Sequence, residues 1–237
     1  MKIAVPAVLP SSLADLKGKL SLFTNITGVE RIQIDIVDGI FAEPACWPYT
    51  APKELAAMIA QGEMLPQLNR VTYEVDLMCV DAERAVQDWL TLGVTRLTFH
   101  AESASDLPRL LAFVREKYGS GANFATGLIS FGLAVNVASH LALIEPCLDE
   151  VEYVQFMGIA KIGRQGQPLD ERVFEKMRIF HEKHPSIAMQ VDGGVTLENA
   201  RKLIALGVSN LIVGSALAKS PSATLAAFED LKPSFGV

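Results

Sequence analysis

Three aspartates lie in stretches that otherwise alternate like buried β-strands. In the stretch 30–37, Gln33 and Asp35 occupy the face opposite three isoleucines, and the same alternation places Asp76 in 70–78 and Asp192 in 186–192 opposite apolar residues. A carboxylate on the inner face of a core strand is costly unless it is paired, protonated or bound to a metal. The three aspartates therefore predict a site of chemistry at three strand ends.

Two of these carboxylates suit proton transfer at a carbon atom. Asp35 belongs to the second predicted strand and Asp192 to the seventh, so they approach the centre of a barrel from opposite sides. One can remove a proton from one face of a carbon while the other returns a proton to the opposite face, provided one starts ionised and the other protonated. This predicts an epimerase or racemase with Asp35 and Asp192 as the catalytic pair. In the alternative, the aspartates cap loops or pair with arginines, which explains one such residue more readily than three.

A divalent metal is the economical way to keep three converging carboxylates ionised, because without a cation they repel one another and raise their own pKa values. The predicted ligands are Asp35, Asp76, Asp192 and the amide of Gln33. An all-oxygen set suits a hard ion, so we expect Mg²⁺ or Mn²⁺.

Glycine pairs predict a phosphate site. Gly193 and Gly194 follow the seventh predicted strand, and Gly214 and Ser215 follow the eighth. Turns at these two places commonly bind phosphate through backbone N–H groups and a helix amino terminus.

A glycine-rich loop at 157–167 is expected to close over the ligand. It offers the amides of Gly163 and Gly166 and the charges of Lys161 and Arg164. The alternative for these two basic residues is a solvated surface loop.

Short β-type runs alternate with amphipathic helical runs along the whole chain. Strands are expected at 2–9, 30–37, 70–78, 94–100, 129–136, 151–157, 186–192 and 209–213. Helices are expected at 12–23, 51–60, 81–90, 106–118, 138–146, 170–181, 197–206 and 221–231. Eight such units predict a (β/α)₈ TIM barrel, an α/β fold whose catalytic residues sit at the carboxyl ends of the strands. A doubly wound sheet fits less well, because strands covered on both faces should be apolar on both.

Composition fits one domain spanning residues 1–237, with 50% hydrophobic and 20% charged residues. The net charge of −6 and the lack of a basic patch argue against a nucleic-acid partner. Apolar runs are too short to span a membrane, and the first one reads better as a strand than as a signal peptide. Three widely spaced cysteines suit the reducing cytoplasm.

The chain resembles the ribulose-phosphate 3-epimerase family over nearly its full length. The family's strand-two motif, His-Val-Asp-Val-Met-Asp-Gly-His-Phe, is similar to residues 33–41, and its Thr-Val-His-Ala-Glu is similar to residues 98–102. Val-Asp-Gly-Gly-Val and Gly-Ser-Ala match residues 191–195 and 214–216 outright.

The resemblance implies epimerisation at C3 of a ketopentose 5-phosphate in the pentose phosphate pathway, D-ribulose to D-xylulose, through a 2,3-enediolate. It implies Asp35 and Asp192 as base and acid, and His100, Asn136 and Met157, with Met78 as a further methionine, around the substrate. Both metal-binding histidines of the family are replaced, by Gln33 and Asp76. We therefore expect a retained isomerase with a changed metal preference.

Other functions remain open on the sequence. Lys161 near the end of the sixth strand suggests a Schiff-base aldolase, although Lys161 lies beyond the strand, in the loop, and no apolar surroundings are predicted for it. Loss of the histidines suggests a sugar-phosphate-binding paralogue without catalysis, and His100 is as readily a hydrogen-bonded interior histidine as a catalytic one. Phe41 and Trp47, after the second strand, suggest an interface and hence a homo-oligomer.

Overall fold

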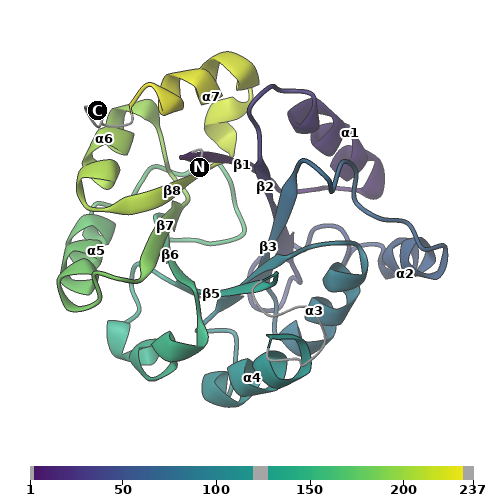
Figure 1. Ribbon diagram of the computed structural model, residues 1–237, viewed down its shortest axis with the longest axis horizontal. Coiled ribbons are helices and arrows are strands. Elements are labelled where there is room, and N and C mark those ends of the chain that lie inside the picture. The colour runs from purple at the N-terminus through teal and green to yellow at the C-terminus, as the bar shows by residue number, and fades with distance from the viewer. Residues whose placement is uncertain (1–2, 120–127, 232–237) are drawn as a thin grey trace.

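The computed structural model describes residues 3–119 and 128–231, which form a closed barrel of eight parallel strands inside a ring of helices (Figure 1). The strands are β1 (Ala4–Val8), β2 (Arg31–Val37), β3 (Thr72–Met78), β4 (Arg96–His100), β5 (Ser130–Val135), β6 (Tyr153–Met157), β7 (Ala188–Asp192) and β8 (Val208–Val213). The α-helices of the described residues are α1 (Leu13–Thr24), α2 (Pro52–Ala60), α3 (Ala82–Thr91), α4 (Leu107–Val114), α5 (Arg172–Lys183), α6 (Leu197–Ala205) and α7 (Pro221–Glu229). Pairing of β8 with β1 closes the sheet, which confirms the predicted (β/α)₈ barrel.

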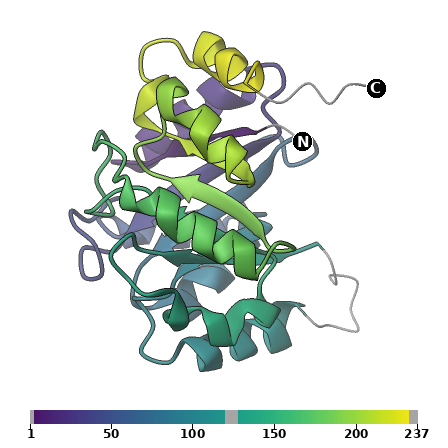
Figure 2. The ribbon, with the colours of Figure 1, turned by 90° about the vertical axis from the view of Figure 1, so that its left-hand side faces the viewer.

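Alternation along each strand separates two environments. On β2, Ile32, Ile34 and Ile36 are fully buried in the apolar layer between sheet and helices, and Gln33 and Asp35 point into the barrel. Figure 2 shows this layering from the side, with helices lying along the outside of the strands. Because the side-chain period of a strand is two residues, this register fixes which residues can meet at the barrel axis.

The helix expected at 138–146 is wrong. Two short 3₁₀ helices, η2 (Leu141–Leu143) and η3 (Glu145–Glu150), take its place after β5. Pro146 lies in the first turn of η3 and has no N–H to donate, so it would interrupt a continuous α-helix at this point. The other predicted helices and all predicted strands are confirmed within a few residues at their ends. Helix α4 is followed by a π-helical turn, η1 (Arg115–Gly119).

The barrel interior below the site is ionic and hydrogen-bonded. The fully buried Glu74 carboxylate accepts from Arg96 at 3.0 Å and Arg31 at 3.4 Å. It also accepts from the Gln190 amide at 2.5 Å and the Thr98 hydroxyl at 3.1 Å. Burial alone would raise the pKa of Glu74, but the two arginines outweigh burial and lower it, so this carboxylate stays ionised.

Trp47 is a core residue, so the prediction that it contributes to an interface between subunits is wrong. Its side chain is fully buried, meets Trp89 edge to face at 6.0 Å, and donates to the Glu54 carboxylate at 3.0 Å. Phe41 is partly buried and packs against the His100 ring. Cys46, Cys79 and Cys147 are free thiols with buried side chains. No helix of the described residues is long and apolar enough to cross a bilayer.

Candidate active site at the carboxyl ends of the strands

Asp35, Asp76 and Asp192 converge at the upper end of the barrel interior. One carboxylate oxygen from each lies within 4.8 Å of the others. Strand register explains why the three carboxylates lie close together. Asp35 of β2 pairs in register with Asp76 of β3, and Asp192 points inward from β7, on the opposite side of the closed sheet. The geometry of the three predicted aspartates is therefore confirmed. None of them makes an ion pair with an arginine or lysine among the described residues.

The Gln33 amide joins the two predicted catalytic acids. Its Nε2 donates to Asp35 Oδ1 at 2.9 Å and to Asp192 Oδ2 at 2.7 Å. Its Oε1 is buried and has no hydrogen-bond partner. Rotation of this amide would turn Oε1 toward the carboxylates, so three carboxylates and one amide oxygen can face a common point. This oxygen-rich set fits the hard divalent ion expected from the sequence.

The electrostatics of the cluster favour a retained proton. Burial, followed by the neighbouring Asp192 and Asp76 carboxylates, raises the pKa of Asp35 well above its ordinary value. Burial and Asp76 also raise the pKa of Asp192, to about 7, although the Gln33 hydrogen bond and His100 oppose the rise. Like charges this close cannot all ionise freely. Near neutral pH, the site can therefore hold one acid and one base.

Asp76 has a histidine partner on the next strand. His100 Nε2 lies 3.0 Å from Asp76 Oδ1, and both side chains are fully buried. Burial alone would lower the pKa of His100, but the Asp76 carboxylate outweighs burial and raises it. His100 is not among the residues that line the pocket, and Phe41 packs over its ring. His100 therefore contacts Asp76 from the neighbouring strand and lies outside the pocket lining.

Gln155 on β6 is a site residue that the sequence reasoning missed. Its Nε2 donates to Asp76 Oδ2 at 3.1 Å and reaches Asp192 Oδ2 at 3.5 Å. Its Oε1 accepts from Gln190, which also donates to Glu74, so a chain of amides connects the ionic layer to the acidic cluster. The sequence signal for Gln155 was a polar residue in the otherwise apolar strand predicted at 151–157.

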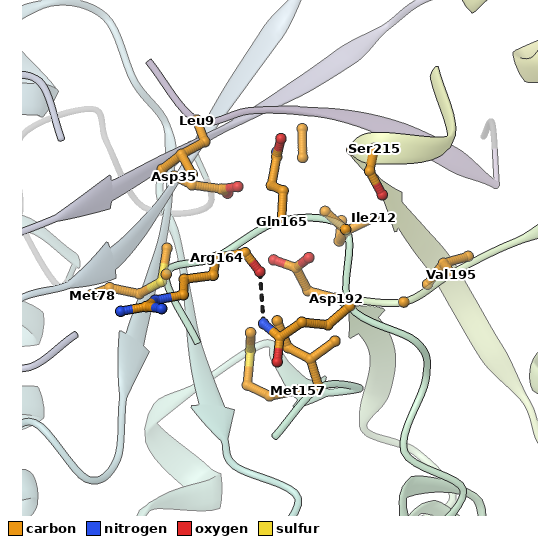
Figure 3. Close-up of a pocket in the computed structure, with 18 residues that line it drawn as sticks. Leu9, Asp35, Met78, Met157, Arg164, Gln165, Asp192, Val195, Ile212 and Ser215 are labelled. Atoms are coloured by element: carbon orange, nitrogen blue, oxygen red, sulfur yellow. Dashed lines mark hydrogen bonds between the residues drawn. The ribbon is translucent and has the colours of Figure 1, made fainter. Parts of the chain in front are cut away.

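A pocket opens above the acids and is lined by both glycine turns (Figure 3). Gly194 has φ +70°, and a Cβ there would lie 2.5 Å from the Leu169 backbone nitrogen. Thr196 caps α6 with a reciprocal capping box, so the helix amino terminus points toward this turn. Gly193, Gly194, Gly214 and Ser215 all line the pocket, as do Asp35, Asp192 and Met157. The structure thus brings the predicted phosphate cradle and the predicted acids to one cavity.

The loop after β6 folds over the pocket through its own hydrogen bonds. Gln167 donates to the carbonyls of Lys161 at 2.5 Å and Arg164 at 2.8 Å. Gly163 and Gly166 line the pocket, together with the side chains of Arg164 and Gln165, the latter not foreseen. Lys161 is exposed and lies outside the pocket lining.

Asn136 also lies outside the pocket lining. Its backbone N–H donates to Glu102 Oε1 at 2.8 Å, and its side-chain Oδ1 is buried without a partner. The substrate contact expected for Asn136 stays a prediction.

The protein is a closed (β/α)₈ barrel with an acidic cluster at the carboxyl ends of its strands. It therefore belongs to the class of TIM barrels, whose functional sites lie at this end of the barrel. Residues 2–218 match the ribulose-phosphate 3 epimerase family, so the chain belongs to it.

Named relatives share this assignment at low identity. The chain is 28% identical to the chloroplastic ribulose-5-phosphate-3-epimerase of Arabidopsis thaliana over 219 residues, covering 91% of this chain and 71% of that one. It is 25% identical to the ribulose-phosphate 3-epimerase of Aquifex aeolicus, covering 92% and 90%. Among solved structures, 3-hexulose-6-phosphate synthase from Salmonella typhimurium aligns with a TM-score of 0.66 at 13% identity over 97% of each chain, which bears on the fold alone.

Proposed function

We propose that the protein is an isomerase that inverts C3 of a ketopentose 5-phosphate, interconverting D-ribulose 5-phosphate and D-xylulose 5-phosphate. The observation that carries this proposal is the meeting of Asp35 and Asp192 in one pocket with the two glycine turns. The family assignment supports it, because the relatives described above carry that activity in their names.

The two aspartates supply opposite proton transfers. The ionised acid takes the proton from C3, and the electron pair of the broken C3–H bond forms the C2–C3 double bond while negative charge moves to O2. The protonated acid then delivers its proton to the other face of C3. The raised pKa values of Asp35 and Asp192 support this division, since a base and an acid near neutral pH are what the cycle needs.

The remaining groups hold the substrate and the acids in place. Backbone N–H groups at Gly193, Gly194, Gly214 and Ser215 bind the phosphate, and Met157 packs beside the reacting carbons. Asp35, Asp76, Asp192 and the Gln33 amide oxygen would hold Mg²⁺ or Mn²⁺, which would neutralise charge that develops on the substrate oxygens.

Proton NMR in D₂O tests the proposal. We expect D-ribulose 5-phosphate to give xylulose 5-phosphate carrying deuterium at C3. Binding of the sugar phosphate without any C3 exchange would instead indicate a paralogue that only binds. The Schiff-base alternative is disfavoured, because Lys161 is exposed outside the pocket lining, and borohydride should trap no adduct with ketose phosphates.

A further inference from the structure

The pocket carries one cationic side chain among its described lining residues, and this residue belongs to the loop after β6. The charged groups of the lining are Asp35, Asp192 and Arg164. Arg164 donates through Nε to the Glu43 backbone carbonyl at 3.0 Å and makes no ion pair with a described carboxylate. Arg164 is thus an exposed residue of the pocket lining whose positive charge has no carboxylate partner among the described residues.

Arg164 lies at the end of the pocket remote from the phosphate cradle. In the view of Figure 3, Arg164 and Met78 of β3 lie toward one side of the pocket, and Ser215 and Val195 lie toward the other side, with Asp192 between them. The contact with Glu43 agrees with this, because Glu43 belongs to the loop after β2, across the barrel from β7. A substrate with its phosphate in the cradle would present its first carbon to Arg164.

The loop that presents Arg164 is built to hold it there. Gln167 fixes the loop backbone through the Arg164 carbonyl, and Gly163 has φ +79°, where a Cβ would lie only 3.2 Å from the Ala42 side chain and 3.3 Å from that of Val37. At the other end, Gln165 Nε2 would lie 2.8 Å from a Cβ on Gly214, so its amide reaches the cradle. Arg164 and Gln165 thus lie toward opposite ends of the pocket, where they could contact the two ends of one ligand.

We propose that the same pocket also accepts substrates that bear a carboxylate at the end remote from the phosphate, so that its substrate class extends from ketopentose 5-phosphates to phosphorylated 2-keto sugar acids. An arginine fork matches a carboxylate with two parallel hydrogen bonds, whereas a neutral hydroxymethyl group uses neither the charge nor the fork. Arg164 would also offset the repulsion of such a carboxylate by Asp35. The inference rests on the proposed function, because it places the phosphate in the cradle and keeps inversion at C3 next to the C2 ketone. The proton steps are unchanged: the C3–H bond breaks toward one aspartate, and a new C3–H bond forms from the other.

Binding of two unreactive ligands isolates the inference from catalysis. D-ribonate 5-phosphate and D-ribitol 5-phosphate differ only in carrying a carboxylate or a hydroxymethyl group at the first carbon, and neither has a C2 ketone. Calorimetry should show the ribonate binding about ten- to a hundredfold more tightly to the unmodified protein, as a charge-assisted bidentate pair predicts. In Arg164→Gln this preference should vanish or reverse. The affinity for D-ribitol 5-phosphate should change by less than about threefold, because this ligand has no carboxylate for Arg164 to bind.

Lys161→Gln is the matched control, since it removes an exposed positive charge from the same loop outside the pocket lining, and it should keep the full preference. Two results with the unmodified protein would overturn the inference: equal binding of the two ligands, or no binding of either at millimolar concentration. Two results with Arg164→Gln would also overturn it: a carboxylate preference that survives, or equal losses of affinity for both ligands. The proposed inversion fails separately: a carboxylate preference without C3 deuterium exchange in either D-ribulose 5-phosphate or 2-keto-D-ribonate 5-phosphate would refute the epimerase and leave the substrate class standing.

Discussion

Replacing Asp192 by Asn should abolish activity and stabilise the fold at alkaline pH. Asn has almost the same shape, and its side-chain oxygen can still accept the Gln33 hydrogen bond that Asp192 Oδ2 accepts at 2.7 Å. What it loses is the capacity to exchange a proton. Because a positioned general acid or base contributes about 10²- to 10⁴-fold, we expect C3 deuterium exchange to fall by at least about a hundredfold.

The stability gain follows from the raised pKa of Asp192. A rise from its ordinary value of 3.8 to about 7 means that ionising this group in the folded protein costs about 4 kcal/mol more than in the unfolded chain. The penalty is absent below pH 3.8, grows as the pH rises toward 7, and is constant above it. Asp192 is partly exposed to the pocket, so water screens part of the penalty. We therefore expect about 2 kcal/mol of extra stability at pH 8.

Urea unfolding of both proteins at pH 5 and pH 8, without added metal, measures this gain. The difference in unfolding free energy should be larger at pH 8, because Asp192 is mostly protonated at pH 5. The variant should show no C3 exchange at either pH. A variant that is less stable than the unmodified protein at pH 8, or equally active, would refute the electrostatic reasoning for this residue.

Three further predictions concern the cradle, the ionic layer and the metal. Gly194→Ala should raise KM for the sugar phosphate by at least about tenfold, because the added Cβ would meet the Leu169 backbone. The control is Gly166→Ala, which has a similar φ but open space around the added Cβ and should change KM little. Steady-state kinetics of both variants measure this difference. Glu74→Gln should lower the unfolding free energy by about 3 to 5 kcal/mol in urea titrations, because Arg96 would lose its buried carboxylate partner, and an unchanged midpoint would contradict the role of this layer. Exhaustive chelation should reduce C3 exchange and Mn²⁺ should restore it, so full activity after chelation would rule out the metal.

The architecture and the acidic cluster could be read from the sequence because both depend on short-range alternation. Polar residues at every second position of 30–37 and 70–78 fix the inward face, and the inward faces of a closed barrel must meet. The helix expected at 138–146 is wrong for an equally local reason, because Pro146 interrupts it.

The direction of Arg164 was beyond the reach of the sequence. It depends on a contact with the Glu43 carbonyl, 121 residues away, and on the Gln167 side chain that fixes the loop. No periodic pattern encodes either contact. The same holds for Trp47 in the turn before α2, because it packs against Trp89 of α3 and is therefore a core residue rather than the expected surface residue.

The replaced histidines of the family are compensated within the barrel. Where the family carries a histidine on strand three, this chain has Asp76, and His100 on β4 and the Gln155 amide donate toward its two oxygens. Gln33, in place of the other histidine, donates to both catalytic candidates. Each of the three carboxylates therefore has at least one side-chain nitrogen donor: Gln33 for Asp35 and Asp192, and Gln155 for Asp76. A donor set of this kind holds the three carboxylates in place before any ligand arrives, as the proposed acid–base pair requires.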